Sequence, residues 1–298
     1  MKIRNRRTDL ALEAAELFQE CSKNTTLLQG VRSEERSRDG ISVTTVHILD
    51  ENGGKILGKP PGRYVTLTLD SLLRREDDAF PRTVHALADE LALLLPQDNP
   101  TAPVLVAGLG NRAITPDAIG PKAHDCTLVT RHLVSQVPEH FGSFRSVVSL
   151  ATGVLGTTGL ESGELVKSVC QSLSPSCVIA VDALASRSLN RLCRTVQLSD
   201  TGIVPGSGVG NHRHALTRDS LGIPVIAIGV PTIVDAATLA ADLLDLEELP
   251  DLGAEKDLLV TPKDIDIQVA ALSKVIGYAI ALALQPGLTL EDLDLLLS

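Results

Sequence analysis

The chain has 298 residues, of which 44% are hydrophobic, so it can bury a substantial core as one large domain or two small ones, and a disordered tail is excluded. The core is aliphatic, with four Phe, two Tyr and no Trp, and the formal net charge is -10. Base stacking needs aromatic side chains and phosphate binding needs basic ones, so this composition argues against a nucleic-acid function. No apolar run approaches the ~20 residues that span a bilayer, and no secretory h-region follows the basic start, so we expect neither a membrane nor a secretory segment.

The first third of the chain predicts few regular elements. Residues 1–38 are polar, apart from a short helical pattern near residues 10–18. Residues 41–49 and 64–69 predict strands, because β-branched residues dominate the first and apolar residues alternate in the second. Asn52-Gly53 between them indicates a turn.

After residue 100, short apolar runs of buried-strand type alternate with helical patterns. The expected strands are 104–107, 146–150, 178–181, 195–198 and 224–228. The expected helices are 126–137, 232–246 and 265–280, and a further helix is expected just before this region, over 84–95. This alternation predicts one α/β domain with a mainly parallel sheet flanked by helices, and residues 41–70 form an N-terminal antiparallel β-extension of it. Ligands of such sheets gather at the carboxyl ends of the strands, so the residues that follow each strand are the ones to inspect.

A carboxylate, Asp117, follows the first of these strands. The preceding GLGN (108–111) and Ala113 satisfy the loose dinucleotide pattern GxGxxG/A, which requires a helix to begin within the glycine turn. Thr115-Pro116 interrupts that helix and Gly120-Pro121 delays it, so the dinucleotide interpretation fails. We expect a long loop that holds Asp117 over the sheet edge, and a cap of the next helix is an equal alternative.

A second carboxylate, Asp182, directly follows the apolar run 178–181. A carboxylate is costly to bury without a partner or a purpose, and a strand end favours a purpose. The alternative is a structural ion pair with Arg187 or Arg191. If Asp117 and Asp182 meet in a partly dry cleft, one keeps its proton while the other activates water, which is the logic of peptide hydrolysis by paired aspartates.

The segment 199–211 carries weaker signals. Asp200-Thr201-Gly202 matches the active-site triplet of pepsin-like proteases, but those are all-β proteins that need two copies of it. The glycines that follow can cradle an oxyanion or form a tight turn, and we favour the turn. Ser207 lacks the GxSxG elbow because Pro205 replaces the first glycine, which disfavours a serine hydrolase. Supporting residues without a defined role are Asp200, Thr201, Gly202, Glu161 and Ser207.

No metal site is evident, because the five scattered cysteines form no CxxC pair and the seven histidines form no HExxH pair. We expect free thiols in a reducing compartment, no metal and no other cofactor.

An ordered series of segments covers nearly the whole chain. They are RTDLA (7–11), GRYVTL (62–67), GLGN (108–111), TPDAIGPKA (115–123), TRHL (130–133), TGLES (158–162), VDALASRS (181–188), SDTGIVPGSGVGN (199–211), GIPVIAIGVPTIVDA (222–236) and VTPKDID (260–266). No single segment is decisive, but together and in this order they resemble the germination protease family of spore-forming bacteria.

The resemblance implies an endopeptidase that degrades small acid-soluble spore proteins during germination, as a homotetramer in the cytoplasm of the forespore or spore core. It implies a fold like that of hydrogenase-maturation peptidases and phosphorylases. The family's two proposed catalytic aspartates lie in its TPDA and DALA motifs, so the resemblance assigns these roles to Asp117 and Asp182.

The resemblance also implies an inactive zymogen that removes its own N-terminal segment. The family's substrate pattern, an acidic residue followed by an apolar residue and Ala, places the cut between Ala11 and Leu12. Residues 1–11 are then a propeptide and residues 12–298 a single peptidase domain.

Two other functions stay open. The GxGN loop and the later Asp-Ala pair also resemble the hydrogenase-maturation endopeptidases, in which matching carboxylates recognise a nickel ion on the substrate. A metal requirement would separate that function from the first. The other alternative is a non-catalytic module that holds small proteins in the same acidic cleft. Loss of activity in Asp117→Asn with substrate binding retained would favour the enzyme.

Overall fold

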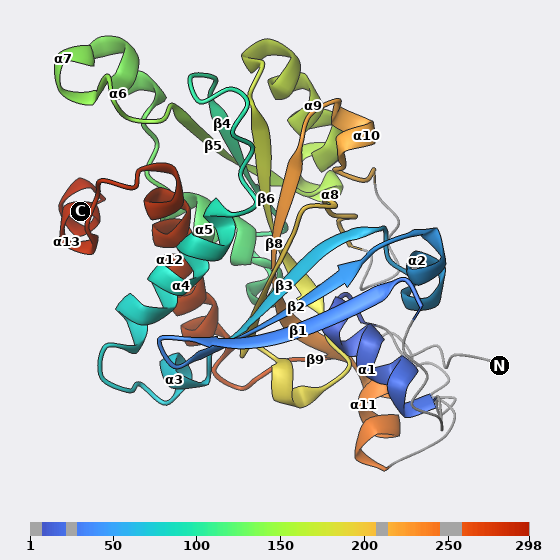
Figure 1. Ribbon diagram of the computed structural model, residues 1–298. Helices are drawn as coiled ribbons and strands as arrows, with labels where there is room; N and C mark the ends of the chain where they lie inside the picture. Colours follow the sequence, from blue (N-terminus) through green and yellow to red (C-terminus); the bar gives the residue numbers. More distant parts are fainter. Residues whose placement is uncertain (1–7, 22–28, 207–213, 245–257, 298) are drawn as a thin grey trace.

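The computed structural model describes residues 8–21, 29–206, 214–244 and 258–297 (Figure 1). Within these ranges, one nine-stranded sheet has the order β1-β2-β3-β7-β8-β6-β4-β5, and β9 pairs with the end of β8. The strands are β1 (Val31–Arg38), β2 (Ile41–Ile48), β3 (Gly62–Thr68), β4 (Val104–Leu109), β5 (Val147–Gly153), β6 (Cys177–Ala185), β7 (Thr195–Ser199), β8 (Val225–Asp235) and β9 (Leu259–Val260). Strands β5, β4, β6 and β8 are parallel, and the remaining pairs are antiparallel.

Helices lie on both faces of this sheet (Figure 1). The α-helices are α1 (Ala11–Cys21), α2 (Glu51–Leu57), α3 (Asp70–Leu73), α4 (Ala79–Ala92), α5 (Ile119–Asp125), α6 (Arg131–Gln136), α7 (Pro138–Phe141), α8 (Leu155–Thr158), α9 (Ser162–Leu173), α10 (Arg218–Leu221), α11 (Ala236–Leu243), α12 (Ile265–Leu284) and α13 (Leu290–Leu296). The described residues also form the 3-10 helices η1 (Thr115–Asp117) and η2 (Leu189–Arg191). The predicted α/β fold with a central sheet flanked by helices is therefore confirmed.

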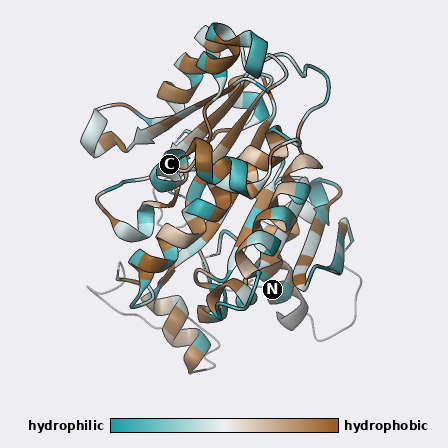
Figure 2. Ribbon diagram, turned by 90° about the vertical axis from the view of Figure 1, so that its left-hand side faces the viewer, coloured by the Kyte–Doolittle hydropathy of each residue, from teal (hydrophilic) through white to brown (hydrophobic). Residues whose placement is uncertain are grey.

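Alternation along β4 explains why both faces need helices. Val104 and Val106 belong to the core under α4, α5 and α12, while Leu105 and Ala107 pack with Val166 of α9 in a second core. All these side chains are fully buried, as expected of a parallel strand covered on both faces. Figure 2 shows the same pattern, with hydrophobic residues concentrated along the strands.

Helix α12 contributes many of the buried residues of the larger core. It is the one helix of the described ranges that is long and apolar enough to cross a membrane, by length and composition alone. However, 67% of its most apolar window is buried against the rest of the molecule, as in a core helix. Gly277 permits this packing, because a Cβ there would lie 2.4 Å from the carbonyl oxygen of Cys126.

The β-extension belongs to the same sheet, since β7 pairs with β3 on one side and β8 on the other. A third core lies on this half of the sheet, where Ala11 and Ala15 of α1 pack against Val46 and Tyr64 of β2 and β3. The N-terminal helix is thus fastened to the face of the extension.

Several elements of the first third differ from the sequence expectations, and the short helix α3 was not expected. Strand β1 was not predicted, because its side chains are mostly exposed and polar and only its backbone pairs with β2. The turn predicted at Asn52-Gly53 is wrong, since these residues lie in α2, where the Asp50 carboxylate accepts the Gly53 N–H at 2.8 Å. Helix α4 begins before the predicted residue 84.

In the α/β half, β6 and β8 run further than predicted. The helix predicted over 232–246 begins only at Ala236, because the apolar β8 continues through Asp235. The helix predicted over 126–137 is wrong in its first part: α5 ends at Asp125 and α6 begins at Arg131. Helix α5 begins at Ile119, before Gly120-Pro121, since a proline fits the first turn of a helix.

Candidate active site

A cavity of about 490 Å³ lies where β4 ends beside β6. Its lining includes Asp117 from η1 and Asp182 from β6, and Asp9 from the N-terminal segment. Asn111, Ser162 and Thr232 contribute polar groups to its wall. The two aspartates singled out in the sequence, which are far apart along the chain, thus share one cavity.

Asp117 is held by the loop that precedes it. The Asn111 N–H donates to its Oδ2 at 2.8 Å, and its own N–H donates to the Ile114 carbonyl oxygen at 2.8 Å. Gly110, with a φ of 109°, lets the loop fold back, because a Cβ there would lie 2.2 Å from the Asp117 carbonyl oxygen. Asp117 is not a helix cap, since the N-cap of α5 is Ala118, without a side-chain hydrogen bond. The half-buried carboxylate stands in the cavity wall instead.

Asp182 lies inside β6 and not after it, which corrects the expected strand boundary. The position still agrees with the strand-end rule, because the last pair between β4 and β6 is Gly108 with Val181. Asp182 is the next residue, pairs in register with Gly229 of β8 and is 4% exposed. Its Oδ1 accepts the N–H of Ala183 at 2.9 Å.

The two arginines proposed as ion-pair partners of Asp182 have other carboxylates beside them. The Arg187 Nε lies 3.7 Å from Oδ1 of Asp242. Arg191 pairs with Glu16 at 2.6 Å and with Glu13 at 3.8 Å. These contacts fasten α1 and α11 to the loop after β6.

The glycines that mimic a dinucleotide motif serve backbone packing. A Cβ on Gly108 would lie 2.2 Å from the carbonyl oxygen of Gly120, and a Cβ on Gly120 would lie 2.2 Å from that of Leu109. Helix α5 therefore packs directly against the end of β4, and the intervening loop with η1 is raised over the sheet edge.

The Asp-Thr-Gly triplet lies away from the aspartate cavity. The Asp200 Oδ1 accepts the Arg63 N–H at 2.8 Å, and the Thr201 hydroxyl donates to the Tyr64 oxygen at 3.1 Å, so the triplet ties the end of β7 to β3. Thr201 and Gly202 line a second cavity of about 330 Å³.

The other two supporting residues are placed differently. Glu161 is the N-cap residue of α9, and it is its neighbour Ser162 that lines the aspartate cavity. Ser207 lies outside the described residues, although Pro205 and Gly206 line the cavity just before it.

The predicted processing site lies beside this cavity. Ala11 is the first residue of α1 and fully buried, and neither Ala11 nor Leu12, both described, lines the aspartate cavity. Asp9 does line it, and sequence reasoning missed that contact. The Asp9 N–H donates to the Ala185 carbonyl oxygen at 2.9 Å, so the segment continues the edge of β6 where β4 no longer pairs.

Burial shifts the pKa values of two ionisable groups near the N-terminal segment. It raises the pKa of Glu13, although Thr8, the Arg187 and Ser188 N–H groups and Arg191 act in the opposite direction. Burial lowers the pKa of Lys59, and the negative charges of Asp9 and Glu13 offset part of that effect. Within the described ranges, no group of three or more His, Cys, Asp or Glu side chains is arranged to hold a metal ion.

Comparison with known proteins gives relatives that cover 80% to 98% of this chain. A germination protease from Clostridium perfringens is 44% identical over 97% of this chain and 98% of its own length. One from Caldanaerobacter subterraneus is 44% identical over 98% of both chains. One from Oceanobacillus iheyensis is 46% identical over 80% of this chain and 66% of its own.

Among solved structures, the [NiFe] hydrogenase maturation protease HycI from Thermococcus kodakarensis is similar over 64% of this chain and 98% of its own, with 16% identity and a TM-score of 0.36. The family model described as germination protease matches residues 11–256. The chain belongs to the germination protease family.

Proposed function

We propose that this member of the family is an endopeptidase in which Asp117 and Asp182 hydrolyse the peptide bond as a pair. The observation that supports the proposal is their shared cavity at the carboxyl ends of the strands. An ionised carboxylate there takes a proton from water as the water oxygen attacks the peptide carbonyl carbon. The protonated partner donates its proton to the carbonyl oxygen, and the C–N bond then breaks as the amine leaves with a proton.

The finer aspects of the function rest on the family. We propose that the substrates are small acid-soluble spore proteins, cut during germination, and that the chain works as a homotetramer in the cytoplasm of the forespore or spore core. We also propose that it is made as a zymogen with residues 1–11 as propeptide and 12–298 as the peptidase domain, including the β-extension at 41–70.

Self-processing between Ala11 and Leu12 then needs a movement. Ala11 is fully buried at the start of α1, and its N–H is bonded to the Gln197 side chain at 2.8 Å. The bond after it lies outside the aspartate cavity. The first turn of α1 therefore has to leave its site before the cut, which couples processing to release of the segment.

The test is cleavage of a purified small acid-soluble spore protein by the wild type, Asp117→Asn and Asp182→Asn, with every cut mapped by mass spectrometry. Asparagine keeps the size of the side chain but removes its acid-base chemistry, so each variant should lose about 10²- to 10⁴-fold in cleavage rate. Asp219→Asn, an exposed aspartate on α10, is the matched control and should cut like the wild type.

Parallel reactions with chelator and a binding measurement separate the alternatives. Wild-type rates in either variant would remove that residue from the mechanism. Loss of wild-type cleavage with chelator would favour the metal-dependent maturation chemistry. Substrate binding without cleavage by the wild type, even after the segment up to Ala11 is removed, would leave a binding module.

A further inference from the structure

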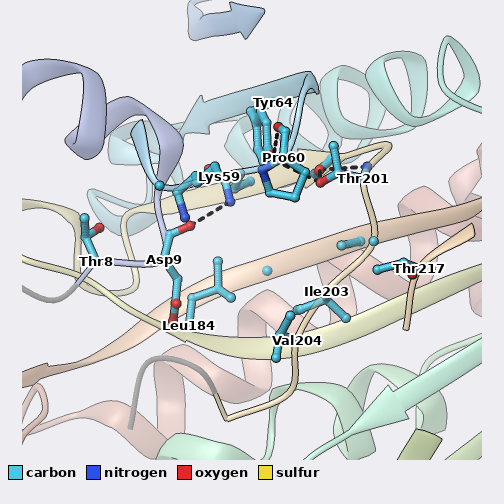
Figure 3. A pocket seen from close by; sticks show the side chains of 16 residues that line it. Thr8, Asp9, Lys59, Pro60, Tyr64, Leu184, Thr201, Ile203, Val204 and Thr217 are labelled. Atoms are coloured by element: carbon cyan, nitrogen blue, oxygen red, sulfur yellow. Dashed lines mark hydrogen bonds between the residues drawn. The ribbon is translucent and has the colours of Figure 1, made fainter. Parts of the chain in front are cut away.

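Residues 8–11 run beside the two cavities. Asp9 and Leu184 line both the aspartate cavity and the second cavity, so the two cavities adjoin at this segment, and we call the place that residues 8–11 occupy the groove. Figure 3 shows the second cavity, with Thr8 and Asp9 on one side and Lys59, Pro60 and Tyr64 above them. The groove therefore has a polypeptide occupant in this structure.

A single side chain, Gln197, holds the main chain of this occupant. Its Nε2 donates to the Asp9 carbonyl oxygen at 3.3 Å, and its Oε1 accepts the Ala11 N–H at 2.8 Å. Neighbouring strands of a parallel sheet are joined by the same pattern. A residue on one strand bonds to the carbonyl oxygen of the residue before its opposite neighbour and to the N–H of the residue after it. Gln197 is 7% exposed, and both of its bonds go to main-chain atoms. It can therefore hold an extended peptide whatever its side chains are.

The side chains of residues 9–11 lie in surroundings that favour particular residue types. The Asp9 Oδ2 accepts the Ala185 N–H at 2.8 Å, and the half-buried Lys59 lies beside Asp9 in the cavity wall and attracts its charge (Figure 3). Leu10 and Ala11 that follow are both 0% exposed. The groove thus fits an acidic residue followed by an apolar one and a small one.

Departure of residues 8–11 would remove the partners of the Gln197 amide and of the Ala185 N–H, which is costly for buried polar groups. Lys59 would lose the attraction of the Asp9 charge and keep that of Glu13. A second peptide with the same main-chain pattern and an acidic side chain restores all of these contacts.

We propose that this groove is a peptide-binding subsite in which Gln197 holds the main chain of the substrate and Lys59 selects an acidic side chain. The proposal rests on the proposed function for the identity of the peptide as a substrate. Lys59 is then a specificity-determining residue and Gln197 a substrate-binding residue of the reaction.

The first test is the cleavage pattern of the full chain on a purified small acid-soluble spore protein and on versions with Asn or Lys in place of acidic residues near the mapped cuts. Lys59→Met should reduce the preference for the acidic over the amide version by about threefold to tenfold, and Lys59→Glu should favour the Lys version. Gln197→Met should lower cleavage of all versions alike, because it removes main-chain bonds. Lys55→Met, an exposed lysine of α2, is the control and should keep the wild-type preference.

The second test needs no activity. Hydrogen exchange of the Ala11 amide is compared in the wild type, Asp9→Asn, Lys59→Met and the double variant. If Lys59 interacts with the Asp9 carboxylate, either single substitution should lower the protection of the Ala11 amide about threefold to tenfold. The double variant should then be little less protected than the single variants.

The two readouts separate the subsite from the proposed function. Coupling between positions 9 and 59 without any cleavage would support the subsite and contradict the protease function. Cleavage whose preference ignores both the acidic residue and Lys59 would support the protease function and overturn the subsite. Independent effects of the two substitutions on Ala11 exchange would also overturn it.

Discussion

At the scale of single residues, the site depends on one backbone conformation that favours glycine. The φ of 109° at Gly110 lets the loop after β4 turn back so that the Asn111 N–H reaches the Asp117 carboxylate. A side chain at Gly110 would collide with the Asp117 main chain and strain the backbone at once. The position of Asp117 is therefore coupled to the backbone conformation of Gly110.

Gly110→Ala should lower the free energy of unfolding by about 1–3 kcal/mol and reduce cleavage at least tenfold, because the loop must shift and Asp117 moves with it. Urea unfolding followed by circular dichroism and cleavage assays on the same samples measure both effects. The control is Gly222→Ala, since Gly222 has a φ of 75° but open space around its Cβ position. It should cost about 1 kcal/mol and leave cleavage intact. Wild-type activity in Gly110→Ala would contradict the coupling.

Cys126, Cys170, Cys177 and Cys193 are free, as predicted. Burial raises the pKa of Cys170 and Cys177 to about 11 and that of Cys193 to about 12. The thiolate is the reactive form, so these side chains act as small hydrophobic core residues and not as nucleophiles.

At the scale of elements, α1 is fastened through one buried carboxylate. Glu13 is 0% exposed, and its two oxygens accept the N–H groups of Arg187 and Ser188 at 2.7 and 3.1 Å. The net effect of its surroundings is a pKa above the ordinary 4.5, caused first by burial. The docked helix therefore binds the Glu13 proton more tightly than the released segment does.

Docking of α1 should consequently be strongest below the ordinary pKa of Glu13 and weaken as the pH rises through the raised pKa. We expect the protection of α1 amides, corrected for intrinsic exchange, to fall as the pH rises from acid to neutral. Glu13→Gln should remove this dependence, whereas Glu16→Gln, which changes a half-buried carboxylate on the same helix, should keep it. An equal pH dependence in Glu13→Gln would assign it to another group.

The sequence predicts those elements whose burial pattern is local. Apolar runs predict the parallel strands, and apolar residues at helical spacing predict α12. Both patterns can be recognised in the local sequence alone. Strand β1 does not, because VRSEERSR has no apolar face and is a strand only through its pairing with β2. The end of β8 is also set by long-range contacts, since residues 232–235 fit a helix start equally well until β9 pairs with them.

The same distinction holds for the site. The strand-end rule indicates Asp117 and Asp182 as candidates, because parallel topology brings the ends of β4 and β6 together, and the family motifs add their proposed roles. Asp9, Lys59 and Gln197 could not be selected, since their meeting depends on how α1, α2 and β7 pack. The signal that remains is Gln197 itself, an amide inside an apolar strand run, which needs a buried partner.

At the scale of the whole molecule, one sheet carries both halves of the chain. Leu198 of β7 pairs with Val65 of β3 and with Ile228 of β8, so the hydrogen-bond ladder passes without a break from the β-extension into the parallel half. Leu67 of β3 and Ile179 of β6 belong to one core and are both 0% exposed. The two halves therefore share the interactions that stabilise them.

We expect Leu67→Ala and Ile179→Ala each to cost about 2–5 kcal/mol and to lower the unfolding midpoint of both halves together. Urea unfolding with pulsed hydrogen exchange and mass spectrometry follows each half separately. Leu295→Ala, an exposed leucine of α13, should change neither midpoint. If the β-extension of Leu67→Ala unfolds before the parallel half, the two halves are separate cooperative folding units and the prediction is wrong.

The groove also contains a built-in optical label. The chain has no Trp and only two Tyr, and one of these, Tyr64, lines the second cavity with its hydroxyl bonded to the Pro60 carbonyl oxygen at 2.9 Å. The other, Tyr278, is a residue of α12 and belongs to the larger core. The near-ultraviolet absorption and the fluorescence of the chain therefore arise almost entirely from two phenol rings in different surroundings. With Tyr278→Phe, the remaining emission comes from the wall of the groove, so that exchange of its occupant can be watched in real time without attaching a dye.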